Sequence, residues 1–286
     1  MIKPHPYGVE LGVLIGMLRE TKGRSLSSAL QADFARVSER VAVEICKTAG
    51  LRPEMRPKTL GVQEIEALFR AIPKVKIMAP PTNCIVPIGD ELLLVGLKET
   101  VKAEFYTSIT RPPSVYRGNP FQIEVGLAYG GELPADELVD LWRFANRVPL
   151  QYQQSGCAIA RAALTTDWRK YGLQQSKGAL PAAPMVLFVH MVSVWVPFTS
   201  ESKEAVAAYP EIIRELRLGL QEVGRRLGGF LRHRRRLAEE DKKKSYIKSY
   251  IPHIGIALRE ILGLTKQDEA KVVEVLTETL ERSRTL

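Results

Sequence analysis

Apolar residues recur with two different periods along the 286-residue chain, and the change of period divides it. Up to about residue 75 they return every three or four positions, which is typical of helices that bury one face. This spacing predicts helices at about 8–18, 27–48 and 62–71, with Gly50 ending the second one. We therefore expect residues 1–76 to form a small all-helical domain.

After residue 76 the helical period gives way to strand patterns. A short helix is expected at about 90–101, and the alternation of polar and apolar residues over 121–129 predicts a half-buried strand. Residues 138–148 favour a second strand, although their apolar positions also fit a helix, and residues 155–164 favour a helix. This part of the chain is therefore expected to combine a sheet with helices.

The run from Met185 to Val196 is almost entirely apolar and rich in β-branched and aromatic residues. Such a run predicts a strand that is covered on both faces. We interpret His190, within the run, as a core histidine whose polar atoms find partners. Pro197 ends the run, and the hydroxyl-rich turn after it offers N-cap residues for a helix that begins near Lys203.

The expected fold class is α+β, with more than one domain. A narrow apolar seam extends the helix that begins near Lys203 to about residue 244. Residues 77–286 are expected to form a single domain, an α/β sandwich with helices on one face of the sheet. This domain would include a long stalk helix at about 203–244 and terminal helices at about 245–286.

Charge and cysteine content narrow the possible partners. The chain has 41 Lys and Arg against 32 Asp and Glu, a net charge of +9, which favours an anionic partner such as nucleic acid. The 3 cysteines lie far apart without metal-ligand spacing, so we expect reduced thiols and no metal site.

No apolar run reaches the length of a membrane span, and the first residues lack the apolar region of a signal peptide. We therefore expect a cytoplasmic protein without a membrane partner.

Two groups of cations are candidate anion-binding residues. Lys203, at the expected start of a helix, would suit a phosphate, although a solvated surface lysine is the alternative. A basic run over residues 225–244 would either be a solvated helix face or contact nucleic acid. The candidates within this run are Arg232, Arg234, Arg235 and Arg236.

Sequence signatures of a self-contained active site are absent. The chain contains no Walker-type phosphate loop, no glycine-rich dinucleotide turn and no Cys/His cluster with metal-ligand spacing. If the protein takes part in catalysis, much of the catalytic machinery must therefore come from elsewhere.

Six motifs follow one another along the chain and together resemble a known family. They are KPHPYG at 3–8, YRGNPF at 116–121, AYGG at 128–131, WRFANRVPL at 142–150, WRKY at 168–171 and VPFTSESKE at 196–204. In this order they resemble the B subunit of archaeal DNA topoisomerase VI. In that family an ATPase domain precedes a helix-two-turns-helix domain, a transducer domain and a stalk that reaches the DNA-cleaving A subunit. The chain resembles everything after the ATPase domain, with residues 1–76 as the helix-two-turns-helix domain and 77–286 as the transducer.

The resemblance implies the transducer part of the B subunit of an ATP-dependent type II (type IIB) DNA topoisomerase. It would relay the ATP state to the A subunit for double-strand passage. ATP and Mg²⁺ would bind mainly to an ATPase domain absent from this chain, and without that domain and the cleavage tyrosine the chain would be inactive by itself. The implied partners are the A subunit, through the stalk and C-terminal helices, the ATPase domain, and double-stranded DNA in the nucleoid. The family also implies a homodimer of B subunits within a heterotetramer.

The resemblance also assigns roles to single residues. By motif, Lys203 corresponds to a lysine that enters the ATP site and contacts the γ-phosphate, and Trp195 stands where the family often has a second lysine. Trp168, Arg169 and Tyr171 match a motif implicated in sensing DNA, and Lys170 lies beside them. For Trp168 alone, an aromatic anchor in the core is the alternative.

The alternative function is an ATP-independent, DNA-associated scaffold for a topoisomerase-like nuclease. It would resemble the degenerate B-type partners of the nucleases that make meiotic double-strand breaks. The two functions differ in their expected response to nucleotide and to Lys203→Ala, because only the transducer requires Lys203 to contact ATP.

Overall fold

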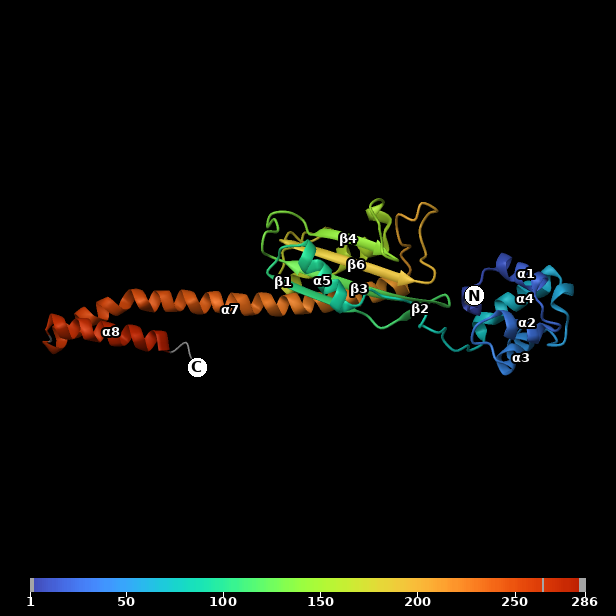
Figure 1. Cartoon of the computed structure of the whole chain (residues 1–286), viewed down its shortest axis with the longest axis horizontal. Helices are drawn as coiled ribbons and strands as arrows, with labels where there is room; N and C mark the ends of the chain where they lie inside the picture. The colour runs from blue at the N-terminus through green and yellow to red at the C-terminus, as the bar shows by residue number, and fades with distance from the viewer. Residues whose placement is uncertain (1–2, 264, 283–286) are drawn as a thin grey trace. The chain divides into compact units, whose positions relative to one another are not determined.

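The computed structural model describes residues 3–263 and 265–282 (Figure 1). Two compact units divide the chain, Met1–Leu227 and Gly228–Leu286. The first contains the N-terminal helices and a 6-stranded sheet, and the described part of the second is helical. The predicted domain boundary at residue 76 lies inside the first unit and stays a prediction.

The N-terminal helices begin at serine caps. The hydroxyls of Ser25 and Ser38 each accept a backbone N–H at the start of a helix. Between these two helices Arg36 has φ 61°, a left-handed conformation that no helix continues through, so the single helix predicted over 27–48 is wrong. The helices are α1 (Leu11–Glu20), α2 (Leu26–Asp33), α3 (Glu39–Thr48) and α4 (Val62–Ala71), with 3₁₀ turns η1 (Pro6–Gly8), η2 (Pro57–Thr59) and η3 (Ile72–Lys74).

These helices share one hydrophobic core, in which Leu14, Leu18, Ile45 and Leu68 are fully buried. The buried members run from Val9 to Ile77, which confirms the helical interpretation of the N-terminal residues. We call residues 9–77 the N-terminal helical region. Its assignment as a helix-two-turns-helix domain stays a prediction.

The sheet follows the order β1-β3-β6-β4-β5, and β2 pairs with β3. Neighbouring strands are antiparallel except β4 and β6, which are parallel. The strand interpretation of residues 138–148 is confirmed, whereas the first strand was not predicted. The strands are β1 (Phe105–Thr110), β2 (Ser114–Tyr116), β3 (Asn119–Tyr129), β4 (Asp140–Ala145), β5 (Val148–Pro149) and β6 (Met185–Ser193).

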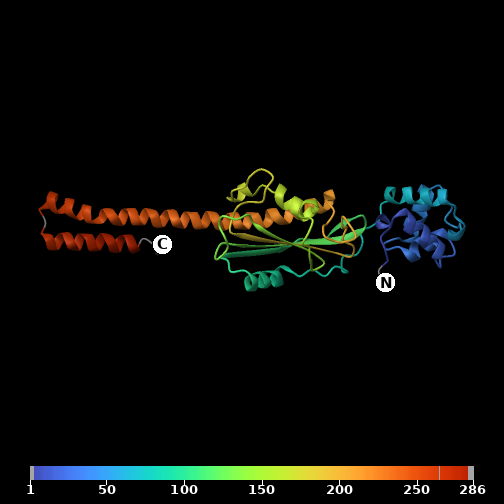
Figure 2. The same cartoon turned by 90° about the horizontal axis from the view of Figure 1, so that it is seen from above.

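Helices cover both faces of the sheet (Figure 2). A Cβ atom placed on Gly126 of β3 would meet Leu93 and Leu97, whereas a Cβ on Gly219 would meet Val125, the neighbour of Gly126 on the opposite face. The expectation of helices on one face is therefore wrong, and β3 is buried on both faces instead of half-buried. The helices on the sheet are α5 (Asp90–Thr100) on one face, and α6 (Ala158–Thr165) with the start of α7 (Pro210–Leu262) on the other.

A buried carboxylate on β3 joins the start of α5 to the sheet. Glu124 has no exposed surface, and four donors converge on its oxygens. They are the N–H groups of Ile88 (2.9 Å) and Gly89 (2.7 Å), the Thr110 hydroxyl (3.0 Å) and Nδ1 of His190 (2.8 Å). Burial alone would raise the pKa of Glu124, but these hydrogen bonds outweigh it and hold the pKa below its usual value.

His190 is the satisfied core histidine that the sequence predicts. Its Nε2 atom lies 2.9 Å from the backbone nitrogen of Arg147, which can only donate. The proton therefore lies on Nδ1, which donates to Glu124. Both ring nitrogens are thus bonded inside the core, and the residue has a structural role.

The 53-residue helix α7 differs from its predicted bounds at both ends. It begins at Pro210, where the fixed φ of proline suits the first helical position and its missing N–H removes no helical bond. The predicted start near Lys203 is therefore wrong, as is the end at about residue 244, since α7 continues to Leu262. Its predicted seam is buried against the sheet at Leu216, Leu220, Val223 and Leu227.

The second unit contains the later part of α7 and the helix α8 (Lys266–Arg282). Arg259 on α7 bonds Glu269 on α8 at 2.7 Å. A Cβ atom on Gly255 would lie 2.6 Å from Val273, so the two helices approach closely there. The expected terminal helices are thus the end of α7 and α8.

Candidate functional site

The Lys203 loop, residues 198–206, connects β6 to α7 and is closed at its base by backbone pairing. Phe198 and Val206 form an isolated antiparallel bridge, and the Thr199 N–H donates to the Ala205 carbonyl at 2.9 Å. At the tip, the Lys203 N–H donates to the Ser200 carbonyl at 3.1 Å. The base of the loop is therefore fixed by hydrogen bonds that do not involve the lysine side chain.

Lys203 lies at the exposed tip of this loop with φ 56°, in the left-handed region. A non-glycine residue there costs about 1 kcal/mol relative to glycine. Within the part of the chain that the structure describes, no carboxylate lies at ion-pair distance from its ammonium group. Lys203 is not part of the first turn of α7, because that helix begins at Pro210. The exposed cation is available to an anion from outside.

The Trp168 turn, residues 167–172, is anchored by its aromatic side chain. Trp168 is fully buried, and its indole N–H donates to the Ala163 carbonyl at 2.9 Å. Its backbone N–H donates to the Gln175 side chain at 3.0 Å. The Trp168 ring is thus enclosed by protein in this conformation, which favours the anchor interpretation of this residue.

The cations of the turn face solvent. Arg169 and Lys170 are exposed, and both approach the Asp167 carboxylate, at 3.0 Å and 3.8 Å. The hydrogen bond from Arg169 is the main cause that holds the pKa of Asp167 below its usual value. One carboxylate against two cations leaves a net positive turn.

Tyr171 packs against α7 at a position where only glycine fits. A Cβ atom on Gly224 would lie 2.5 Å from the Tyr171 ring, and the neighbouring Arg225 is exposed. The sequence alone does not identify Tyr171 as the group that approaches Gly224. The structure therefore adds Gly224 and Arg225 to the surroundings of the turn.

The four predicted arginines of the basic run lie on α7 in the second unit, and all are exposed. Arg236 pairs with Glu240 at 3.2 Å, one helical turn away. An exposed ion pair of this kind contributes little to stability. The arginines in question are Arg232, Arg234, Arg235 and Arg236.

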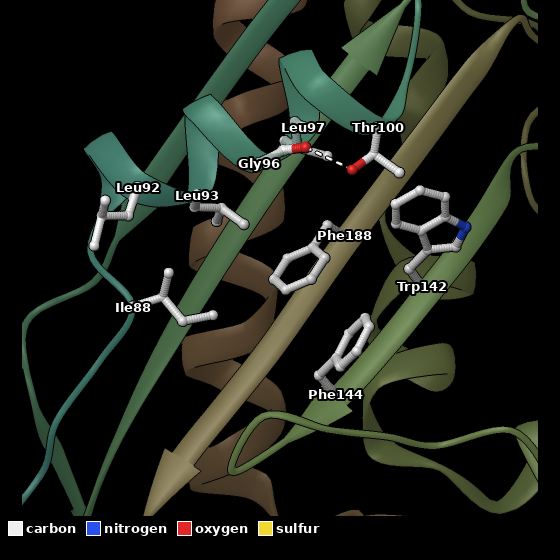
Figure 3. Close-up of a pocket in the computed structure, with 9 residues that line it drawn as sticks. All are labelled: Ile88, Leu92, Leu93, Gly96, Leu97, Thr100, Trp142, Phe144 and Phe188. Carbon is white, nitrogen blue, oxygen red and sulfur yellow. Dashed lines mark hydrogen bonds between the residues drawn. The ribbon is translucent and has the colours of Figure 1, made fainter.

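An apolar pocket of about 300 Å³ opens beside α5 (Figure 3). Trp142, Phe144 and Phe188 project into it from β4 and β6, and Leu92 and Leu93 border it from α5. The residues that line it carry no ionisable side chain. It therefore offers apolar contact but no cation for a phosphate.

The structure bears on two further expectations. Among residues 3–263 and 265–282, no group of three or more His, Cys, Asp and Glu residues could hold a metal ion. Within the same residues, no helix has both the length and the apolar character required to cross a membrane.

Comparison with known proteins identifies the family. A family model described as the transducer of the topoisomerase VI B subunit matches residues 80–244, more than half of the chain. The B subunit of type 2 DNA topoisomerase 6 from Methanococcoides burtonii is 46% identical over 272 residues, which cover 95% of this chain and 44% of the relative.

Two further relatives carry the same name. The one from Methanosarcina mazei is 44% identical over 272 residues, covering 95% of this chain and 44% of the relative. The one from Thermococcus kodakarensis is 33% identical over 325 residues, covering 98% of this chain and 56% of the relative. The chain spans about half the length of these relatives, between 44% and 56%. It belongs to the topoisomerase VI B subunit family, whose transducer region it contains.

Proposed function

We propose that the chain relays the ATP state of a separate ATPase domain to the DNA-cleaving A subunit of a type IIB topoisomerase during double-strand passage. The observation that carries this proposal is the exposed Lys203 at the tip of a loop that leads directly into α7. ATP and Mg²⁺ bind mainly to the ATPase domain in this proposal, and Lys203 contacts the γ-phosphate.

The geometry of the Lys203 loop supports a mechanical role. Because the base of the loop is held by the Phe198–Val206 bridge, a pull on the tip moves the whole segment and not the lysine alone. A charge-assisted hydrogen bond contributes about 1.5–3 kcal/mol, enough to bias a two-state hinge but not to bind ATP unaided. The loop would thus convert nucleotide contact into movement of the chain just before Pro210.

The remaining partners are assigned by charge and exposure. Arg169 and Lys170 are available to backbone phosphates of double-stranded DNA, whereas Trp168 and Tyr171 hold their turn against the core and α7. The arginines of the basic run on α7 supply a second set of phosphate contacts. The subunit contacts rest on the family resemblance instead: the later part of α7 and α8 would dock the A subunit, and two B subunits would pair within a heterotetramer.

The test is strand passage by a complex reassembled from this region, the ATPase domain and the A subunit. Lys203→Ala is expected to abolish ATP-dependent strand passage while leaving the fold intact. The matched control is Lys177→Ala, another exposed lysine in a loop, which should leave activity unchanged. Unchanged strand passage in Lys203→Ala, or cleavage that requires this chain but ignores nucleotide, would favour the ATP-independent scaffold instead.

A further inference from the structure

Two of the sequence motifs, at residues 3–8 and 116–121, have no part in the proposed function, yet the structure places them against each other. The first contains η1 (Pro6–Gly8), and the second contains the turn between β2 and β3. Their contact lies within the first compact unit. We call the pair of segments His5–Gly8 and Arg117–Gly118 the joint.

One side of the joint is tied to the end of the N-terminal helical region. The Tyr7 hydroxyl bonds the Val75 carbonyl and accepts the Ile77 N–H at 3.0 Å. Nδ1 of His5 accepts the Tyr7 N–H, so Nε2 carries the proton and donates to the Met78 carbonyl at 3.0 Å. The segment His5–Gly8 therefore moves with the chain that leaves the helical region.

The contact between the two segments depends on two glycines. Gly118 has φ +72°, and a Cβ atom on it would lie 2.7 Å from Nδ1 of His5. A Cβ on Gly8 would lie 2.4 Å from the Arg117 carbonyl oxygen. Real Cβ atoms essentially never approach other atoms this closely, and a carbonyl oxygen cannot turn aside as a side chain can. Side chains at these positions would therefore force the segments apart.

The other side of the joint contacts the start of α7. Tyr116 stacks on Tyr209 with ring centroids 4.4 Å apart. The Arg117 guanidinium lies over both rings, at 5.5 Å and 5.4 Å from their centroids. Because Tyr209 immediately precedes Pro210, the turn that meets the helical region also holds the base of α7.

We propose that the joint is a positioning element that locks the N-terminal helical region to the sheet and to the base of α7. A displacement of the helical region, such as one caused by a bound partner, reaches α7 through this contact and does not pass through Lys203. The inference thus goes beyond the proposed function, because it adds the N-terminal helical region as a second part of the chain whose movement reaches α7.

Distance measurement in the full chain tests the lock. Spin labels attached through non-natural amino acids at Gln63 on α4 and Lys98 on α5 report the separation of the helical region and the sheet, and leave the native thiols intact. The wild-type chain is expected to give one narrow distance distribution, and Gly118→Ala a broad or shifted one. Gly178→Ala is the matched control, because Gly178 has φ +76° with nothing within 4 Å of its Cβ position.

A second pair of variants covers the case in which Gly118→Ala fails to fold. Gly8→Ala should also broaden the distribution, whereas Gly12→Ala, with nothing within 4 Å, should leave it narrow. Circular dichroism is used to check that each variant keeps its secondary structure. A wild-type distribution as broad as that of the variants, or variants as narrow as their controls, would overturn the lock.

Hydrogen exchange tests the contact with α7. The Ile213 N–H donates to the Tyr209 carbonyl at 2.9 Å, so its exchange reports the first turn of the helix. Arg117→Ala and Gly118→Ala should speed this exchange, and Gly178→Ala should not. Unchanged exchange of the Ile213 N–H in Arg117→Ala would show that the joint does not hold the first turn of α7. Neither measurement depends on ATP or on strand passage, so each can fail independently of the proposed function.

Discussion

The Trp168 turn and the Lys203 loop both present cations on short connections, but they are held in different ways. The turn depends on a buried indole and on Tyr171 packed over Gly224. The loop depends on backbone pairing at its base and leaves its tip exposed. A residue that anchors its segment cannot be removed without cost to the fold, whereas a tip residue can. The comparison therefore predicts that substitutions of anchor residues lower the stability of the fold, whereas substitutions of tip residues change function with little effect on stability.

The largest expected effect is that of Trp168→Ala. Removing a fully buried indole leaves a cavity and an unpaired Ala163 carbonyl, which should lower the free energy of unfolding by about 3–5 kcal/mol. Urea denaturation of the chain measures this change. Trp195→Ala is the control, since Trp195 is 51% exposed, and its effect should be much smaller. Equal effects would show that Trp168 is not the anchor of its turn.

Gly224→Ala should have an intermediate effect. The added methyl group would lie 2.5 Å from the Tyr171 ring, and displacing that ring should cost about 1–3 kcal/mol of unfolding free energy. Gly229→Ala on the same helix meets nothing within 4 Å and should stabilise the chain by up to about 1 kcal/mol through helix propensity. If both variants gained stability, the Tyr171 contact would not constrain α7.

Substitutions of Lys203 should change stability less. Lys203→Gly relieves the left-handed conformation at φ 56° and should raise the free energy of unfolding by up to about 1 kcal/mol. Lys203→Ala keeps that conformation and should lie within about 0.5 kcal/mol of the wild type. Both should lose the proposed ATP coupling. Thermal denaturation alongside strand passage measures the two properties, and a strong destabilisation by Lys203→Ala would instead assign the lysine a structural role.

The smallest stability effects are expected for Arg169→Ala and Lys170→Ala. Both side chains are exposed, so each variant should lie within about 0.5 kcal/mol of the wild type in unfolding free energy. The slope of log affinity for duplex DNA against log salt concentration should become shallower by about 0.9 for each phosphate contact removed. Lys177→Ala serves as the control. An unchanged slope in both variants would remove the turn from the DNA interface.

Local patterns were sufficient for several elements. The apolar run at Met185–Val196 predicted a strand buried on both faces, and β6 is buried along its whole length, although it already ends at Ser193. The seam at Leu216, Leu220, Val223 and Leu227 marked the face of α7 that the sheet covers. Both patterns indicate burial because a run or seam of neighbouring apolar residues is stabilised when it is removed from water.

Other features were missed because their local signals are ambiguous. The strand β1 reads Phe-Tyr-Thr-Ser-Ile-Thr, in which polar and apolar residues do not alternate. The break between α2 and α3 depends on the backbone of Arg36, a residue type that rarely adopts positive φ. The hydroxyl-rich turn before Pro210 looked like a helix start, but its N–H groups serve the Lys203 loop instead.

By itself, the sequence of this protein determined where many of the helices and strands form, which residues of β6 and of the α7 seam are buried, and the order of motifs that pointed to the family. The tertiary structure alone decided that helices cover both faces of the sheet, that Trp168 is a buried anchor, and that residues 5–8 meet residues 117–118. The physical reason is the distance along the chain over which each kind of interaction acts. Periodicity and capping act between neighbours in the chain, whereas close packing between distant segments depends on the shape of surfaces that exist only after folding.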